Sequence, residues 1–435
     1  MSGKPGVWSR ATALATATPE SRNRYVDFLR ALSIFAVVIG HWLVAAPYVI
    51  DGDLNLTGNM LQSRPWTQWL TWFFQVMPVF FMVGGYSNGI SWRSALRDGC
   101  SYGEWLSGRL QRLVGPILPL LTVWALLAVA GRQLGVAADL VKTGSQMALV
   151  PVWFLAVYVG VVVLVPFTFA AWHRYGLWSF WALFAAVVLN DVMFLTGTPA
   201  VGWFNYAFIW LAVHQLGYAW LDGRLGGTSK TLVWGASALA LLLALVRFGP
   251  YPLSMVSVPG EDISNSLPPK FPMLLLGIAQ CGLLLALERP ARRWLANLKP
   301  WTTAVLVNGM IMTVFLWHLT AAMLVISIAV VLGGVGLSID PGSGTWWLLR
   351  PVWLSVYITV LLVLTVVFLR FERSGKAQSV AAWRQVVGAT LVCGGLSLLA
   401  LMGIGGEGKL VLNIWVVLMP FVGAALAGVN PVARM

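Results

Sequence analysis

The sequence predicts an all-α fold, a polytopic transmembrane bundle of roughly ten to twelve spanning helices. Apolar residues make up 59% of the 435 residues and charged residues only 10%, and the mean hydropathy is +0.80. Soluble domains carry about 25% charged residues, so this composition indicates a chain that lipid surrounds. The apolar residues also form blocks of about twenty, the length of helix that crosses a bilayer. Barrel strands would give short alternating segments instead.

Twelve apolar blocks are expected to span the membrane. The first follows a polar segment without an apolar leader, so we expect the first helix itself to be the insertion signal. The ninth block is long enough for one tilted helix or for a helix with a re-entrant end. The predicted spans are 28–47, 67–90, 111–131, 147–170, 176–196, 203–221, 231–248, 271–287, 302–332, 346–369, 386–404 and 409–428.

The basic residues of the loops predict the orientation of the bundle. Of the 28 Lys and Arg residues, 20 fall in alternate loops assigned to the cytoplasm and 7 in loops assigned outside, among them Lys270 and Arg350. This asymmetry follows the positive-inside rule and puts both ends of an even-numbered bundle in the cytoplasm. We therefore expect a multi-pass protein of the bacterial inner (plasma) membrane.

The net charge of +13 is explained by the same loops. Nucleic-acid binding needs basic residues gathered on one soluble domain, so we expect membrane lipids and no nucleic acid among the partners. Cys100, Cys281 and Cys393 are scattered without metal-ligand spacing. The sequence has no glycine motif for nucleotide phosphates or dinucleotides. We expect no metal and no permanently bound cofactor.

Ionisable residues inside the membrane are costly and tend to mark function. The first predicted helix carries Asp27, Arg30 and His41. Helical geometry places Arg30 and His41 within roughly 20° of one face and about 16 Å apart. Asp27 precedes Arg30 by one helical turn and can pair with it. A snorkelling pair at the interface is the alternative for Asp27 and Arg30, but it does not account for His41.

A second histidine reaches a similar depth. His318 lies about 21 Å beyond Ala304 if the ninth block is one helix, which places it in the outer half of the membrane like His41. Two histidines at one level can define a buried site, although a hydrogen-bonded contact between helices remains the alternative for each. His214, in the sixth span, is expected to make such a structural contact, and His173 lies in a loop.

An ordered set of motifs resembles acyltransferase family 3, the integral-membrane O-acyltransferases, and within it the actinobacterial branch. The opening stretch from Arg24-Tyr-Val-Asp-Phe-Leu-Arg30 to Gly-His41 matches the family pattern of Arg, ten residues and His. The resemblance covers about residues 22 to 373. Its other parts are Met77-Pro-Val-Phe-Phe-Met-Val-Gly-Gly-Tyr-Ser-Asn88, Arg109-Leu-Gln-Arg112 with Pro116 and Pro119, Trp153-Phe-Leu-Ala-Val-Tyr158, Asn265-Ser-Leu-Pro-Pro269, Trp317-His318 and Arg370-Phe-Glu372.

The resemblance implies a domain organisation and a reaction. Residues 1–24 would be a cytoplasmic tail, 25–373 a ten-helix acyltransferase core, and 374–435 a cytoplasmic linker with two extra transmembrane helices. The core would move an acetyl or other short acyl group from cytoplasmic acyl-CoA onto a hydroxyl of a cell-envelope glycan or glycolipid. Lys270 stands where the family pattern has a small polar residue, which leaves the acceptor open.

The same resemblance assigns roles to single residues. The acceptor hydroxyl must lose a proton, and imidazole titrates near neutral pH, so His41 is the expected general base, with Arg30 as the second catalytic residue. Guanidinium groups suit phosphates, so Arg109 and Arg112 are expected to bind the CoA moiety. Topology anchors are the alternative for these two arginines. The other residues expected to bind substrate are Asp27, Trp153, Tyr158, Asn265 and His318.

Two other classes of function stay open from the residues alone. A transporter or flippase of an envelope lipid or small molecule can also align ionisable residues along a helix. No inverted repeat is evident, and the histidines gather near one level instead of crossing the bilayer. A membrane protein that only binds partners would leave the shared face of Arg30 and His41 unexplained. Consumption of a thioester by the purified protein separates catalysis from both alternatives.

Overall fold

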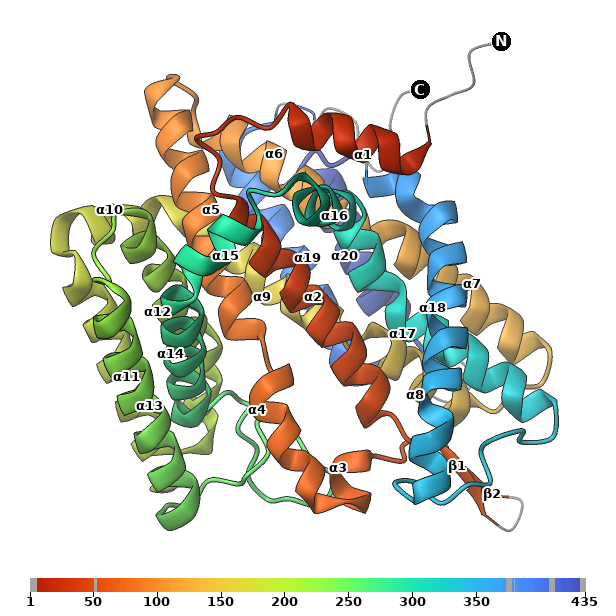
Figure 1. The fold of residues 1–435 in the computed structure, drawn as a ribbon. Helices are drawn as coiled ribbons and strands as arrows, with labels where there is room; N and C mark the ends of the chain where they lie inside the picture. Colours follow the sequence, from red (N-terminus) through yellow and green to blue (C-terminus); the bar gives the residue numbers. More distant parts are fainter. Residues whose placement is uncertain (1–5, 51–52, 373–377, 379, 407–410, 431–435) are drawn as a thin grey trace. The chain divides into compact units, whose positions relative to one another are not determined.

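The chain is described by a computed structural model that covers residues 6–50, 53–372, 378, 380–406 and 411–430. These residues form helices and one short antiparallel pair of strands, β1 (Tyr48–Ile50) and β2 (Asp53–Asn55) (Figure 1). Among the described residues, eight helices are long and apolar enough to cross a membrane, or up to ten if each of two bent pairs is one span. The predicted class, an all-α polytopic membrane protein, is confirmed.

The chain divides into two compact units, and each is built from three separate segments. Unit 1 comprises 1–40, 66–91 and 167–311, and unit 2 comprises 41–65, 92–166 and 312–435. The division falls inside helix α2 (Arg24–Val44), between Gly40 and His41. Residues distant in sequence therefore meet inside each unit.

Unit 1 contains the helices at the start of the chain and those of its middle part. Within it, α11, α12, α13 and α14 lie side by side (Figure 1). Its elements are α1 (Val7–Thr16), most of α2, η1 (Pro65–Leu70), α4 (Thr71–Phe74), most of α5 (Met77–Arg97), α10 (Val165–Tyr175), α11 (Leu177–Leu195), η2 (Pro199–Phe204), α12 (Asn205–Leu221), α13 (Thr228–Phe248), α14 (Phe271–Ala286), α15 (Glu288–Trp294) and α16 (Leu298–Asn308).

Unit 2 contains the last turn of α2 and the C-terminal helices. Its centre is α19, which packs against α6, α8, α9 and α20. Its elements are β1, β2, α3 (Met60–Ser63), the end of α5, α6 (Tyr102–Val114), α7 (Ile117–Gln133), α8 (Ala138–Leu149), α9 (Val152–Val163), α17 (Ile311–Val331), α18 (Gly344–Glu372), α19 (Ala382–Met402) and α20 (Ile414–Leu426).

Small residues let helices of unit 1 touch backbone to backbone. A Cβ atom on Gly217 of α12 would lie 2.2 Å from the carbonyl oxygen of Met82 and 2.5 Å from the amide nitrogen of Tyr86, both on α5. Such contacts are typical of membrane helices, whose association depends on close packing. They hold the segment of α5 that carries polar side chains firmly against α12.

The ninth apolar block is divided into two helices. It is not a single tilted helix, and no continuous helix runs from Ala304 to His318, because α16 ends at Asn308 and α17 begins at Ile311. The break falls at Gly309 and Met310, and the glycine lowers the cost of interrupting a helix there. The helix that bears His318 is therefore α17 alone.

Helix α1 was not predicted, since the segment was assigned to a polar tail. Its buried residues, Ala11 and Ala15, are spaced by four and form one small apolar face. That face packs on α16, where the indole nitrogen of Trp301 donates a hydrogen bond of 3.2 Å to the carbonyl of Ala15. Part of the predicted linker that begins at 374, namely 374–377 and 379, lies outside the described residues.

Candidate active site

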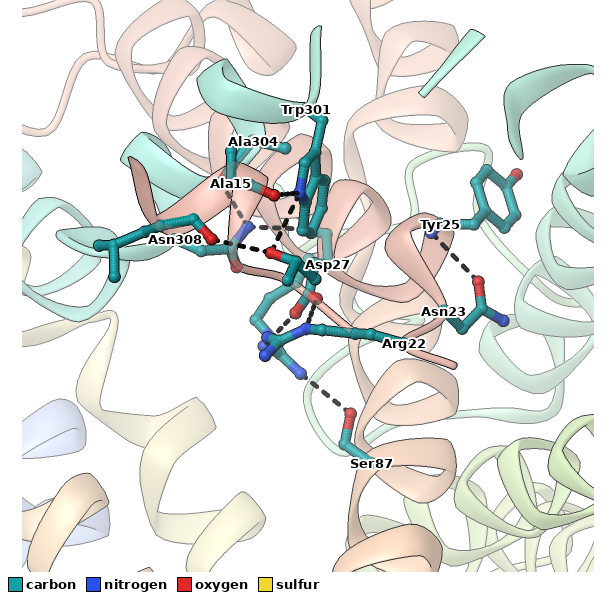
Figure 2. A network of polar contacts seen from close by, with 12 residues as sticks. Ala15, Arg22, Asn23, Tyr25, Asp27, Ser87, Trp301, Ala304 and Asn308 are labelled. Atoms are coloured by element: carbon teal, nitrogen blue, oxygen red, sulfur yellow. Dashed lines mark hydrogen bonds and ion pairs between the residues drawn. The ribbon is translucent and has the colours of Figure 1, made fainter. Parts of the chain in front are cut away.

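A network of polar contacts at the start of α2 surrounds the buried Asp27, which is 5% exposed. One carboxylate oxygen accepts a hydrogen bond of 2.7 Å from Arg22 (Figure 2). The other accepts one of 3.2 Å from Arg30. The backbone carbonyl of Asp27 accepts from the side chain of Asn308 at 2.9 Å. The hydrogen bond to Asp27 raises the pKa of the Arg22 guanidinium. The predicted pairing of Asp27 with Arg30 is thus present.

Arg30 is held from two sides. Besides Asp27 on its own helix, it donates a hydrogen bond of 2.9 Å to the hydroxyl of Ser87 on α5. Its side chain stays 27% exposed. A cation fixed in this way costs little further ordering when it binds an anionic group.

A polar cavity of about 270 Å³ lies beside this network in unit 1. The carboxylate of Glu288 accepts hydrogen bonds from Asn23 at 3.2 Å and from the indole of Trp220 at 2.9 Å. Asn23 directly follows Arg22, and the lining residue Tyr86 directly precedes Ser87. Sequence reasoning missed this cavity, because residues of α5, α12, α13, α14 and α15 line it and no single motif marks it.

His41 and His318 form a pair in unit 2. The two rings are inclined by 7° with centroids 5.1 Å apart, and Nδ1 of His41 lies 2.8 Å from Nε2 of His318. His318 is fully buried, whereas His41 is half-buried. The indole of Trp42 donates a further hydrogen bond of 3.0 Å to the carbonyl of His318. The expectation that the two histidines share one level is confirmed as direct contact.

The hydrogen bonds of His318 determine which nitrogen of each neutral ring carries the proton. Nδ1 of His318 lies 2.6 Å from the carbonyl oxygen of Phe315, and a carbonyl only accepts. The Nε2 atom of a neutral His318 must then be an acceptor, so Nδ1 of His41 is the donor. This leaves Nε2 of His41 with a free lone pair. The geometry is the one expected of a base whose orientation a second residue fixes.

The predicted substrate residues of α9 lie in the same unit as the histidine pair. Tyr158 stacks on Phe154, with ring centroids 5.7 Å apart, and Phe154 meets Phe315 edge to face at 5.6 Å. Phe315 in turn lies one turn before His318 on α17. Trp153 precedes Phe154 and is half-buried. An aromatic row therefore leads from α9 to the histidine pair.

Arg109 and Arg112 lie on the amphipathic helix α6, also in unit 2. Arg112 is exposed, and the guanidinium of Arg109 lies 5.5 Å from the ring centre of Trp105. Gln111, between them, donates to the carbonyl of Asn430 at 2.6 Å and accepts from its amide at 2.8 Å. The extreme C-terminal part of the described chain therefore holds the helix that carries both arginines.

Asn265 lies in the long loop of unit 1 between α13 and α14. Its side chain is fully buried, and its amide nitrogen donates to the carbonyls of Pro252 at 2.8 Å and Ser254 at 2.9 Å. Asn265 thus organises the loop, and it does not belong to the Asp27 network. Its amide oxygen has no hydrogen-bond partner among the described residues.

His214 makes the interhelical contact that was expected of it. Its Nε2 atom lies 3.1 Å from the side-chain nitrogen of Asn88, which joins α12 to α5 inside unit 1. Asn88 follows Ser87, the partner of Arg30. The contact therefore supports the segment of α5 that positions Arg30.

The predicted residues thus form two groups, one in each unit. Asp27, Arg30 and Asn265 belong to unit 1, and the residues of unit 2 are His41, Arg109, Arg112, Trp153, Tyr158 and His318. Two residues with notable contacts were not proposed from the sequence. Arg350 was assigned to an outer loop, but it lies in α18 with 5% of its surface exposed. Glu372 was noted only as part of a motif.

The chain is a multi-pass helical membrane protein that carries ionisable side chains among its helices. These are a hydrogen-bonded histidine pair in unit 2 and a fixed arginine in unit 1. Such residues define a class of membrane proteins in which ionisable groups mark function. A family model described as an acyltransferase domain matches residues 23–370. The chain belongs to this family, acyltransferase family 3, and is therefore an acyltransferase. Comparison with curated proteins and with solved structures found no match.

Proposed function

We propose that this protein transfers an acyl group, acetyl or another short acyl, from acyl-CoA onto a hydroxyl of a cell-envelope glycan or glycolipid. The observation that carries the proposal is the hydrogen-bonded pair of His41 and His318 in a membrane protein of this family. Family membership favours catalysis over the alternative of a transporter or flippase. The carrier of the acyl group is a substrate, and no resident cofactor is needed for the reaction.

His41 acts as the general base in this proposal. Its free Nε2 takes the proton of the acceptor hydroxyl while the hydroxyl oxygen attacks the thioester carbonyl. The tetrahedral intermediate then collapses, the bond between carbon and sulfur breaks, and the CoA thiolate takes the proton from the His41 imidazolium. The products are an ester and free CoA. His318 positions His41, since it accepts the Nδ1 proton and so keeps Nε2 directed at substrate.

The arginines bind the donor in this proposal. Acyl-CoA carries phosphates that are costly to move out of water, whereas its pantetheine arm is thin and mostly uncharged. Arg109 and Arg112, both in unit 2, fall near the cytoplasmic end of their predicted span, where guanidinium groups can bind phosphates. The protein would be a multi-pass protein of the bacterial inner membrane with both termini in the cytoplasm.

The acceptor approaches from the outer side in this proposal. The half-buried Trp153, which directly precedes the aromatic row of unit 2, offers a face on which a sugar can stack. Because His41 lies in the outer half of its predicted span, a hydroxyl at the outer leaflet reaches it over a short path. Membrane lipids would surround the site throughout the reaction.

The test is thioester consumption by the purified protein in nanodiscs. Acetyl-CoA with a hydroxyl acceptor such as octyl glucoside should release CoA thiol, and His41→Gln should reduce the rate about 10²- to 10⁴-fold, the usual contribution of a general base. His173→Gln, which changes a histidine outside both described sites, serves as the matched control. Release of thiol by His41→Gln at the wild-type rate would refute the role of His41, and no release by any variant would count against the acyl-CoA donor.

A further inference from the structure

Arg350 is a buried cation, and its hydrogen-bonding neighbours among the described residues are neutral. One terminal nitrogen of its guanidinium donates to the carbonyl of Ala45, and Tyr357 is its second polar neighbour. The guanidinium carbon lies 3.7 Å from the ring centre of Trp346. No carboxylate of the described residues pairs with it, and its Nε–H group has no hydrogen-bond partner there.

This arrangement is costly for a structural residue. Removing a cation from water costs several kcal/mol unless an anion compensates it. The carbonyl at the end of α2 and the face of Trp346 offset part of that cost. A free Nε–H beside a terminal N–H is also the fork with which arginine binds carboxylates and phosphates through two parallel hydrogen bonds.

Arg350 is linked to the histidine pair by two short routes inside unit 2. The amide of Ala45 donates a hydrogen bond of 3.1 Å to the carbonyl of His41, so Arg350 contacts the turn that follows the proposed base. The second route runs through Tyr357, whose ring lies 5.4 Å from that of Trp42, the residue that donates to the carbonyl of His318. Both routes connect the cation to the residues that fix the site.

We infer that Arg350 is an anion-recognition residue for the acceptor, and that the acceptor carries a carboxylate or a phosphate near the hydroxyl that is acylated. The inference rests on the proposed function, because it names the class of acceptor for the same site. Arg350 lies toward the end of α18 that was assigned to the outer side, the side from which the acceptor would come. The bound oxyanion supplies the counter-charge that the described residues do not provide.

A purely structural role makes a different prediction. If Arg350 only caps the C-terminal carbonyls of α2, its loss lowers stability and affects all acceptors alike. If it recognises an anion, its loss removes the preference for charged acceptors and leaves binding of neutral ones unchanged. Binding measurements therefore separate the two roles without any need for turnover.

The experiment measures binding of three matched probes to the purified protein in nanodiscs by microscale thermophoresis. The probes are octyl glucoside, octyl glucuronide and octyl glucoside 6-phosphate, which share the sugar and the chain and differ in charge. We expect the wild type to bind at least one anionic probe ten- to a hundredfold more tightly than the neutral one, the range of a hydrogen bond to a charged group. The better of the two anionic probes identifies a carboxylate or a phosphate as the recognised group.

Four variants complete the design. Arg350→Gln should lose the preference for anionic probes, and Arg350→Lys should keep part of it. Arg64→Gln, which removes a half-buried arginine paired with Asp340 at 2.7 Å, should keep all of it. His41→Gln should also keep the preference, since binding does not need the base. Equal affinity of the wild type for all three probes, or a preference that survives in a folded Arg350→Gln, would overturn the inference. Absence of thiol release by the wild type, with its preference for the anionic probe intact, would overturn the proposed chemistry alone.

Discussion

Glu372 caps the first turn of α17 through Thr313. One carboxylate oxygen of Glu372 accepts from the amide and the hydroxyl of Thr313 at 3.2 and 2.7 Å, and the other accepts from the amide of Met312 at 3.2 Å. The carboxylate thus satisfies amides at a helix N-terminus that lack partners within the helix, and its charge complements the helix dipole. The residue that ends α18 thereby fixes the start of the helix that carries His318.

The first prediction concerns this cap. Glu372→Ala should lower the free energy of unfolding by about 1 to 3 kcal/mol, because it leaves hydrogen-bond donors without their charged acceptor. The rate of acyl transfer should fall as well, since His318 follows Thr313 by five residues and shifts with the helix. Thermal unfolding in detergent and thiol release measure the two effects. Glu372→Gln should lose less stability and less activity than Glu372→Ala. Asp98→Asn, at an exposed residue, should change neither the stability nor the rate of acyl transfer. Unchanged unfolding of Glu372→Ala would contradict the capping role.

The second prediction concerns the orientation of His41. His318→Phe keeps a ring but removes the acceptor of the Nδ1 proton, so the turnover number should fall about a hundredfold while KM for acetyl-CoA stays unchanged. His318→Gln should keep more activity, because its amide oxygen can still accept. Steady-state kinetics of thiol release distinguish the variants.

A neighbouring residue provides the control for His318. Trp317 directly precedes His318, but its ring stacks on that of Phe368, with ring centroids 3.8 Å apart. Trp317→Phe should therefore keep most of the activity. If His318→Phe turned over at the wild-type rate, the positioning role of His318 would have to be abandoned.

The third prediction concerns the donor. Arg109→Glu and Arg112→Glu should each weaken binding of acetyl-CoA about tenfold or more, and high salt should weaken wild-type binding because these contacts are partly exposed. Equilibrium binding in detergent measures both effects. Arg97→Glu, at an exposed arginine paired with Asp98 at 3.3 Å, is the matched control. If neither reversal changed affinity, the arginines of α6 would revert to topology anchors.

The fourth prediction concerns the C-terminal segment that holds α6. Gln111→Leu should break both hydrogen bonds to Asn430, lower stability by about 1 to 3 kcal/mol and raise KM for acetyl-CoA, because the flanking arginines lose a fixed helix. Unfolding and steady-state kinetics give the two readouts. Gln146→Leu removes a 2.7 Å hydrogen bond between α8 and the carbonyl of Leu401, so it should affect stability but not KM. An unchanged KM in Gln111→Leu would limit the C-terminal segment to a structural role.

The fold could be predicted from the sequence largely because depth in a membrane is a local property. Apolar blocks of about twenty residues mark spans wherever they occur, and counting 1.5 Å per residue along a span predicts the depth of each residue in it. The same counting failed at 302–332, where a glycine and a cap from distant Glu372 divide the block into two helices. A cap supplied by another helix leaves no mark beside the residues that it stabilises.

The candidate site shows the same limit. Asp27 and Arg30 could be paired from their spacing, because one helix holds both. Three other contacts join residues about 280 to 320 positions apart. They are the hydrogen bonds between His41 and His318, between Arg350 and Ala45, and between Gln111 and Asn430. Such contacts depend on which helices pack together, and close packing of small residues decides this. One sequence read alone does not reveal these partners.

The last prediction concerns the pH dependence of stability at Lys270. Its side chain is 1% exposed, donates to the carbonyl of Pro268 at 3.1 Å and lies 3.7 Å from the ring centre of Phe194. Burial lowers the pKa of Lys270 to about 8 in the folded protein, although the charge of Asp191 acts in the opposite direction. The unfolded chain therefore binds this proton more readily between pH 8 and the ordinary lysine value of 10.5.

Folding consequently bears a cost for the charged Lys270 that is complete below about pH 8 and declines as the pH rises toward 10.5. Relative to Lys270→Met, which has no such cost, the wild type should gain stability across this window. The difference between their unfolding temperatures, measured in detergent at pH 7.5 and pH 9.5, should move in favour of the wild type at the higher pH. Lys230→Met, at an exposed lysine of α13, should show no such change against the wild type. A difference for Lys270→Met that is the same at both pH values would mean that the buried amine does not titrate in this range, and that Asp191 balances its burial completely.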